Sequence, residues 1–372
     1  MRKGQNTVHK ISSLQAARGL AALAVIAFHS LFINAKYIPG ATWLPDIFVF
    51  GQTGVDLFFV ISGFVMVLAS ANKFGVRGEI FNFLKGRAIR IYPVYWVYFF
   101  AVLLVFMLKP GMVNSSQAGE VNLLHSFLLL PDANLPLVLV AWSLIHEVWF
   151  YLVFAFILLL PQRWVPLAFA AWLCSVALVS VLYSGPVSPY LRTVKHEFSI
   201  EFILGALAGI VYLKAISEPS KWRLPTGTVA LFGICLIAYA VISGLIDGSD
   251  VIQSISLSRA FIVGGGYTLL LLALALQESK SQWAVPGFLK SLGDMSYSLY
   301  LSHILTLSVC GRIWTALGNA EGGIVASVLF WAISLPVVII VGYLSYKLIE
   351  RPLNKYLSRG LKVKRISQPV VN

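Results

Sequence analysis

The chain has 372 residues, of which 58% are hydrophobic and only 12% are charged. About a quarter of the residues of a soluble domain are charged, so this composition excludes a soluble globular protein. It also excludes a disordered chain, which needs low hydrophobicity. Three cysteines cannot supply the framework of a disulfide-rich protein. The class that remains is a helical membrane protein with several spans.

The net charge of +13 has a simple explanation in such a protein. Lys and Arg collect in the cytoplasmic loops of membrane proteins and fix their orientation. The positive charge therefore predicts topology and contact with membrane lipids, and no nucleic-acid partner is expected.

Ten apolar runs of about twenty residues are each long enough to cross the hydrocarbon as a helix. They cover 13–34, 54–71, 92–108, 138–160, 164–184, 198–214, 225–244, 257–277, 295–316 and 323–348. No small-residue cleavage site follows the first run, so this run is expected to remain as an anchor. The sequence predicts an all-α polytopic membrane protein with about ten transmembrane helices. We expect a single membrane domain over 1–372, with a basic cytoplasmic tail at 355–372.

The distribution of Lys and Arg predicts the orientation. If the N-terminus is cytoplasmic, 22 of these residues lie on the inner side. The six on the outer side are Lys36, Lys109, Arg192, Lys195, Arg259 and Arg312. Such a bias indicates one orientation, and ten spans return the C-terminus to the cytoplasm. Both termini are therefore predicted to be cytoplasmic.

Ionisable side chains inside spans are costly and mark candidate sites. Arg18 and His29 are eleven residues apart on the first span, so they share one helix face, about 16 Å apart along the axis. Asp56 and Glu147 are placed at a depth similar to that of His29. A carboxylate beside an imidazole fixes its tautomer and raises its basicity, as general-base catalysis requires. The alternative is a structural cluster between helices, with Arg18 reaching lipid phosphate.

A second group of charges lies at the predicted cytoplasmic side. The stretch 78–91 has an amphipathic pattern and is predicted to be a surface helix that leads into the third span. Arg87 and Arg90 are neighbours on this helix, and guanidinium groups bind phosphate well. The alternative is that they only serve topology. His146 and Glu147 begin like a zinc-protease helix, but Phe150 replaces the second histidine, so no metal site is expected.

Six segments, in this order, resemble motifs of the acyltransferase-3 family of integral membrane acyltransferases. They are Arg18 with His29, Gly54–Phe64, Arg87 with Arg90 before Tyr92 and Pro93, Trp142–Glu147, Ser296–His303 and Ile349–Pro352. Together they extend over most of the chain. The resemblance is strongest to the stand-alone, ExoZ-like type of bacterial member, which implies O-acetylation of exopolysaccharide or of another surface glycan.

The resemblance implies transfer of an acetyl group from cytoplasmic acetyl-CoA to a hydroxyl of a cell-surface or lipid-linked saccharide. It implies a multi-pass protein of the bacterial inner membrane, with acetyl-CoA as the acyl donor and no metal. Within it, His29 is the essential histidine and Arg18 is its motif partner. By the same resemblance Arg87 and Arg90 match the donor-side arginines, and together with Arg18 they are expected to bind acetyl-CoA.

The remaining site residues have secondary roles in this interpretation. Asp56 or Glu147 is expected to orient His29, so that all three form the catalytic group. Trp142, His146 and His303 are expected to bind substrate or to support the site. One departure from the family pattern is Ser302, where an aromatic residue often precedes the histidine.

Other functions stay open at this stage. The first is a transporter or flippase for a lipid-linked sugar, with the buried charges as a proton relay, although no half-chain repeat is visible. A membrane scaffold is disfavoured by the number of buried ionisable residues. Acyl transfer to an amino sugar or a lipid is a further alternative. The sequence does not identify the acceptor sugar, the acyl chain, the oligomeric state, or the choice between direct transfer and an acetyl-histidine intermediate.

Overall fold

The computed structural model describes residues 11–41, 43–113, 120–183, 185, 187–246, 256–281, 285–319 and 323–358. Throughout these residues the regular structure is helical, which confirms the predicted all-α class. The ten long helices are α1 Ser12–Tyr37, α2 Gly54–Ala69, α3 Glu79–Leu108, α5 Trp142–Ile157, α6 Val165–Leu182, α8 Phe198–Ser217, α9 Thr226–Ile246, α12 Gly265–Lys280, α14 Ser296–Ala316 and α15 Gly323–Ser345. Shorter elements used below are η1 Asp46–Thr53, α4 Leu123–Leu128, α7 Pro189–Lys195, α11 Leu257–Arg259, α13 Gly287–Asp294, η7 Tyr346–Glu350 and α16 Arg351–Ser358.

Nine helical segments in the described part of the chain are long and apolar enough to cross a membrane. They contain all the long helices except α14. This helix has 21 residues and matches the predicted span 295–316, but serines, His303 and Arg312 make it less apolar than the other nine. The cytoplasmic location of both termini stays a prediction. Residues 1–10 and 359–372, which include most of the predicted tail 355–372, lie outside the described residues.

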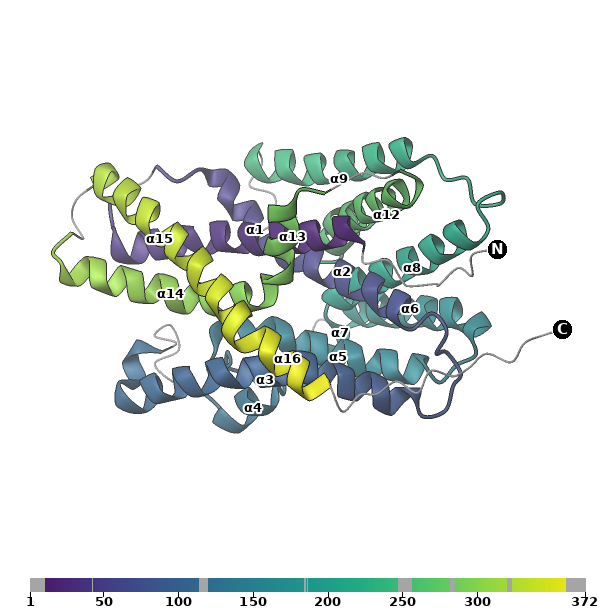
Figure 1. The fold of residues 1–372 in the computed structure, drawn as a ribbon, viewed down its shortest axis with the longest axis horizontal. Coiled ribbons are helices and arrows are strands. Elements are labelled where there is room, and N and C mark those ends of the chain that lie inside the picture. The colour runs from purple at the N-terminus through teal and green to yellow at the C-terminus, as the bar shows by residue number, and fades with distance from the viewer. Residues whose placement is uncertain are drawn as a thin grey trace.

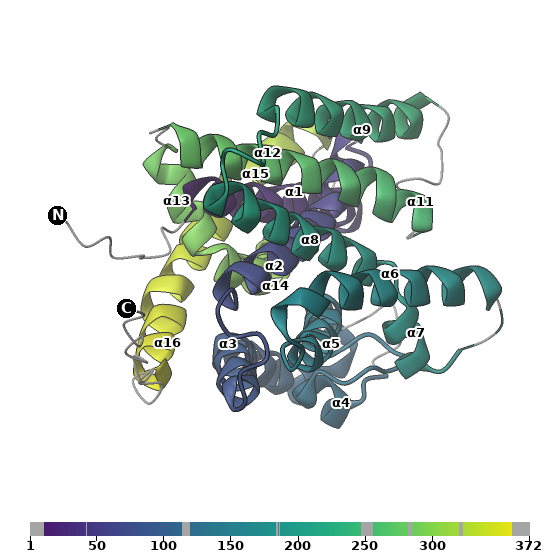
Figure 2. The same ribbon diagram turned by 90° about the vertical axis from the view of Figure 1, so that its right-hand side faces the viewer.

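The helices form two groups around a central pair (Figure 1 and Figure 2). On one side, α9 and α12 lie next to one another, and on the other side are α3, α4 and α5. The central pair α2 and α8 lies between these groups. Helix α1 contacts α2 and α14, and α14 in turn contacts α15. The arrangement brings α1, α2, α3, α5 and α14 around one interior space.

The central pair makes direct backbone contact. A Cβ atom added to Gly63 of α2 would lie 1.9 Å from the carbonyl oxygen of Phe202 on α8. A Cβ atom added to Gly205 of α8 would lie 2.0 Å from the carbonyl oxygen of Val60. Only glycine permits so close an approach, a common means of packing membrane helices.

Helix α3 differs from its prediction. The stretch 78–91 is not a separate surface helix, because α3 is continuous from Glu79 through Pro93 to Leu108. Its 30 residues extend over about 45 Å at 1.5 Å per residue. Arg87 and Arg90 therefore belong to the first turns of a membrane-crossing helix.

The starts of α1 and α14 are both capped by glutamates from distant segments. Glu278 of α12 accepts hydrogen bonds from the backbone nitrogens of Ser12 and Ser13 at 2.7 and 2.8 Å. Glu350 of η7 accepts hydrogen bonds from the nitrogen and the hydroxyl of Ser298 at 3.2 and 2.6 Å. Carboxylates satisfy the free N–H groups of a helix start and interact favourably with its dipole. These contacts fix the two helices that carry His29 and His303.

Candidate active site

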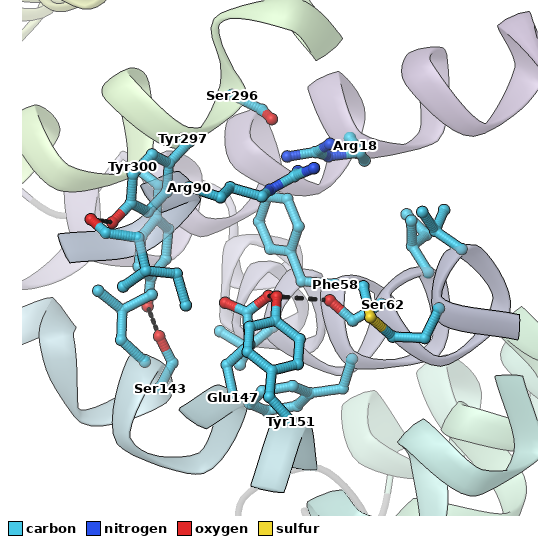
Figure 3. A pocket seen from close by; sticks show the side chains of 17 residues that line it. Arg18, Phe58, Ser62, Arg90, Ser143, Glu147, Tyr151, Ser296, Tyr297 and Tyr300 are labelled. Carbon is cyan, nitrogen blue, oxygen red and sulfur yellow. Dashed lines mark hydrogen bonds between the residues drawn. The ribbon is translucent and has the colours of Figure 1, made fainter. Parts of the chain in front are cut away.

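The interior space between α1, α2, α3, α5 and α14 is a pocket (Figure 3). Its polar lining consists of Arg18, Ser62, Arg90, Ser143, Glu147, Tyr151, Ser296, Tyr297 and Tyr300. On α2 the lining extends from Val55 to Met66. Eleven residues of helix span about 16 Å, so the pocket, here called the passage, is elongated along α2. One end is near the start of α1, and the other is near the start of α5.

The first end is strongly cationic. Figure 3 shows the guanidinium groups of Arg18 and Arg90 close to one another at the edge of the pocket. Within the described part of the chain, neither forms an ion pair with a carboxylate. Arg87 lies nearby, with its guanidinium 5.7 and 5.8 Å from the ring centres of Phe83 and Tyr151. Its Nε and Nη1 are buried, and no described residue accepts a hydrogen bond from them.

Glu147 lies in the pocket wall. One oxygen of its carboxylate accepts hydrogen bonds from the hydroxyl of Ser62, at 3.1 Å, and from the hydroxyl of Tyr151. Glu147 is also close enough to Arg18 for the two charges to interact. The expected contact between Glu147 and His29 is absent, because the carboxylate binds side chains of α2 and of its own helix.

Asp56 has a different partner from the one expected. Its carboxylate forms a bidentate pair with Arg259, with Nε–Oδ1 and Nη2–Oδ2 distances of 2.8 and 2.6 Å. Both side chains are buried, with exposed fractions of 0% and 3%. The pair joins α2 to α11, so Asp56 does not orient His29. Sequence reasoning assigned Arg259 to the outer side only, although a buried carboxylate signals that a cation must lie nearby.

His29 instead lies against His303 of α14. Nδ1 of His29 is 2.9 Å from the carbonyl oxygen of Val25 and 3.2 Å from Nε2 of His303. Nδ1 of His303 is 2.6 Å from the carbonyl oxygen of Tyr300. His303 is fully buried, whereas His29 is half-buried. The structure thus brings the predicted base next to a residue for which only a supporting role was expected.

Tyr300 connects this histidine pair to the pocket. Its ring lies 5.7 Å from that of His303 and 5.9 Å from that of Phe58, which also lines the pocket. Its hydroxyl is hydrogen-bonded to that of Ser143 at 2.8 Å. The passage therefore leads from the arginines to Tyr300, which contacts His303.

Trp142 and His146 are not part of this group. The ring of Trp142 is stacked on Phe198 with centroids 5.7 Å apart. His146 lies against His196 at 4.3 Å, and its buried Nδ1 has no hydrogen-bond partner among the described residues. These four residues form an aromatic cluster between α5 and the start of α8.

Comparison with known proteins agrees with this architecture. A family model described as an acyltransferase domain, that of acyltransferase-3, matches residues 11–347. The chain belongs to the acyltransferase-3 family. It is therefore a multi-pass integral membrane protein of an acyltransferase family, which disfavours the transporter and scaffold hypotheses.

Individual relatives are bacterial. The exopolysaccharide production protein ExoZ of Rhizobium meliloti (strain 1021) is 30% identical over 84% of this chain and 92% of that protein. The acyltransferase MdmB of Streptomyces mycarofaciens is 26% identical over 98% of this chain and 97% of that protein. YrhL of Bacillus subtilis (strain 168), named provisionally as a peptidoglycan O-acetyltransferase, is 23% identical over 96% of this chain and 58% of its own length. No solved structure gives a significant match.

Proposed function

We propose that this protein transfers an acetyl group from cytoplasmic acetyl-CoA to a hydroxyl group of a cell-surface or lipid-linked saccharide. The observation that carries the proposal is the passage itself. It has two guanidinium groups at one end, and at the other it reaches Tyr300, whose ring lies 5.7 Å from that of His303. Acetyl-CoA, which has anionic phosphates at one end and a thioester at the end of a long chain, matches the shape and charge of this passage.

The arginines fit the phosphates of CoA. Arg18 and Arg90 lie at the pocket edge without a carboxylate partner in the described structure, and two buried donors of Arg87 have no acceptor among the described residues. Unpaired buried donors are costly, and phosphate oxygens are suitable acceptors for guanidinium groups. Arg18 and Arg90 would hold the donor directly, with Arg87 beside them.

His29 is the proposed general base. It receives the proton of the acceptor hydroxyl while the oxygen bonds to the acyl carbon, and the proton then passes to the departing thiolate. Since one ester forms as one thioester breaks, no other reactant is needed. General-base catalysis of this kind contributes about 10²–10⁴-fold to the rate. Nucleophilic attack by His29, with an acetyl-histidine intermediate, is the second route.

Glu147 has a different task in this proposal from the one expected from sequence. Its carboxylate fixes Ser62 and Tyr151 in the pocket wall. It also places a negative charge near Arg18, which limits the repulsion between the guanidinium groups when the pocket is empty.

The acceptor class is proposed from the relatives. The name of ExoZ refers to exopolysaccharide, and that of YrhL to peptidoglycan. A saccharide hydroxyl and a location in the bacterial inner membrane agree with both names. An amino sugar or a lipid is the alternative acceptor.

The test is binding of labelled acetyl-CoA to the purified protein in detergent. Arg90→Ala should weaken binding by about 1.5–3 kcal/mol, the value of a hydrogen bond to a charged group. Lys85→Ala is the matched control, because Lys85 is an exposed cation on the same end of α3. Equal affinity in both variants would contradict a donor site at the arginines.

A second variant tests the base. His29→Gln keeps a polar side chain of similar size but cannot take up a proton. It should abolish acetylation of surface glycan in cells and leave acetyl-CoA binding intact. Retained acetylation would exclude His29 as the base.

A further inference from the structure

The hydrogen bonds around His29 and His303 determine which nitrogen of each ring carries a proton. A carbonyl oxygen can only accept, so an imidazole nitrogen that bonds to it must be protonated. Nδ1 of His303 is 2.6 Å from the carbonyl of Tyr300, and Nδ1 of His29 is 2.9 Å from that of Val25. Both neutral rings therefore carry their hydrogen on Nδ1.

This assignment also gives the direction of the contact between the rings. Nε2 of His303 has a lone pair, and it lies 3.2 Å from Nδ1 of His29. The N–H of His29 is therefore shared between the Val25 carbonyl and His303. Nε2 of His29 is left with a lone pair, and no described residue donates a hydrogen bond to it.

From this geometry we infer that His303 is the positioning residue of His29. It accepts the Nδ1 hydrogen and thereby keeps the basic Nε2 directed at the acceptor hydroxyl. The inference rests on the proposed function and adds to it the group that orients the His29 ring, a role that the sequence analysis gave to Asp56 or Glu147. In many enzymes a carboxylate occupies this place beside the imidazole, but here both carboxylates are bound elsewhere.

The surroundings of His303 suit this role. Its side chain is fully buried, and its ring centre is 5.0 Å from that of His29. Its own orientation is fixed by the Tyr300 carbonyl, and its helix is capped by Glu350. When His29 takes up a proton at Nε2, the lone pair of His303 stabilises the resulting cation through the Nδ1 hydrogen. A carbon side chain at this position cannot do so.

The test compares His303→Leu with His303→Gln in the full-length protein. Gln offers an amide oxygen that can accept the His29 hydrogen, whereas Leu offers none. Thr306→Val is the matched control, because Thr306 lies one turn further along α14 and, among the described residues, its hydroxyl bonds only to the carbonyl of Ser302. Thermal unfolding in detergent shows whether each variant is folded.

The first readout needs neither acceptor nor acetyl-CoA. Diethyl pyrocarbonate acylates an imidazole nitrogen that has a free lone pair, and peptide mass spectrometry measures its rate at His29 relative to the half-exposed His125. In metal sites, loss of the hydrogen-bond partner of a ligating histidine lowers its basicity and typically costs about 10–100-fold in metal affinity or activity. A comparable loss of basicity at His29 would slow its acylation. We expect His303→Leu to slow labelling of His29 by about tenfold, His303→Gln to restore most of the rate, and Thr306→Val to leave it unchanged.

The second readout is steady-state acetyl transfer. His303→Leu should lower kcat by about 10–100-fold and leave the KM for acetyl-CoA unchanged, because the arginines are untouched. If His303→Leu does not fold, His303→Asn replaces it, because the shorter Asn side chain does not reach His29. Labelling of His29 should then be slower in His303→Asn than in His303→Gln. The positioning role would be overturned if His29 in His303→Leu were labelled as fast as in the Thr306→Val control. It would also be overturned if His303→Asn and His303→Gln gave equal labelling rates. Failure to bind acetyl-CoA would instead contradict the proposed function and leave the labelling result intact.

Discussion

The buried pair of Asp56 and Arg259 provides the most direct test of the fold. Asp56→Asn and Arg259→Gln each remove one charge and leave the other buried. The pair contains two charge-assisted hydrogen bonds, at 2.6 and 2.8 Å. At about 1.5–3 kcal/mol for each such bond, the loss is about 3–6 kcal/mol, in agreement with about 3–5 kcal/mol for breaking a buried ion pair.

The assay is the free energy of unfolding in detergent for both single variants and the double variant. Because each single change removes the bidentate partner of a buried charge, the double variant should lose less than the sum of the two losses. Asp46→Asn, at an exposed position of η1, is the control and should change stability by less than about 0.5 kcal/mol. Single losses below about 1 kcal/mol, or additive losses, would refute the assignment of a structural role to this pair.

Further outcomes follow from other features of the fold. Glu278→Ala should destabilise the protein by about 1–2 kcal/mol, because two backbone donors at the start of α1 lose their acceptor; thermal unfolding checks this. Gly63→Ala should prevent folding or sharply lower the unfolding temperature, since its Cβ would lie 1.9 Å from a carbonyl oxygen. Gly86→Ala, which meets nothing within 4 Å, should fold normally. Reporter fusions before Met1 and after Asn372 should both be active in the cytoplasm, and an external C-terminus would contradict the charge-based orientation.

The sequence was sufficient to predict the helices because each long apolar run carries its own signal. The sequence also placed Arg18 and His29 on one helix, and both lie on α1; their roles stay predictions. It was not sufficient to pair residues on different helices. Asp56 and Glu147 were matched to His29 by depth alone, but depth does not determine which neighbour a helix faces. The true partners, Arg259 and His303, are separated from Asp56 and His29 by 203 and 274 positions, beyond the reach of any local pattern.

The glycine contact between α2 and α8 determines which helix in the wall of the pocket can move. At Gly63 and Gly205 the two backbones touch, and atoms of a main chain cannot rotate aside as side chains do. Helix α3 has more freedom, because Pro93 lies inside it and donates no backbone hydrogen bond to the preceding turn. One wall of the pocket, α2, is therefore rigid, whereas α3 lacks a backbone hydrogen bond at Pro93, three residues after Arg90. We expect a bulky donor to be admitted by bending of α3, with α2 as the fixed support against which it closes.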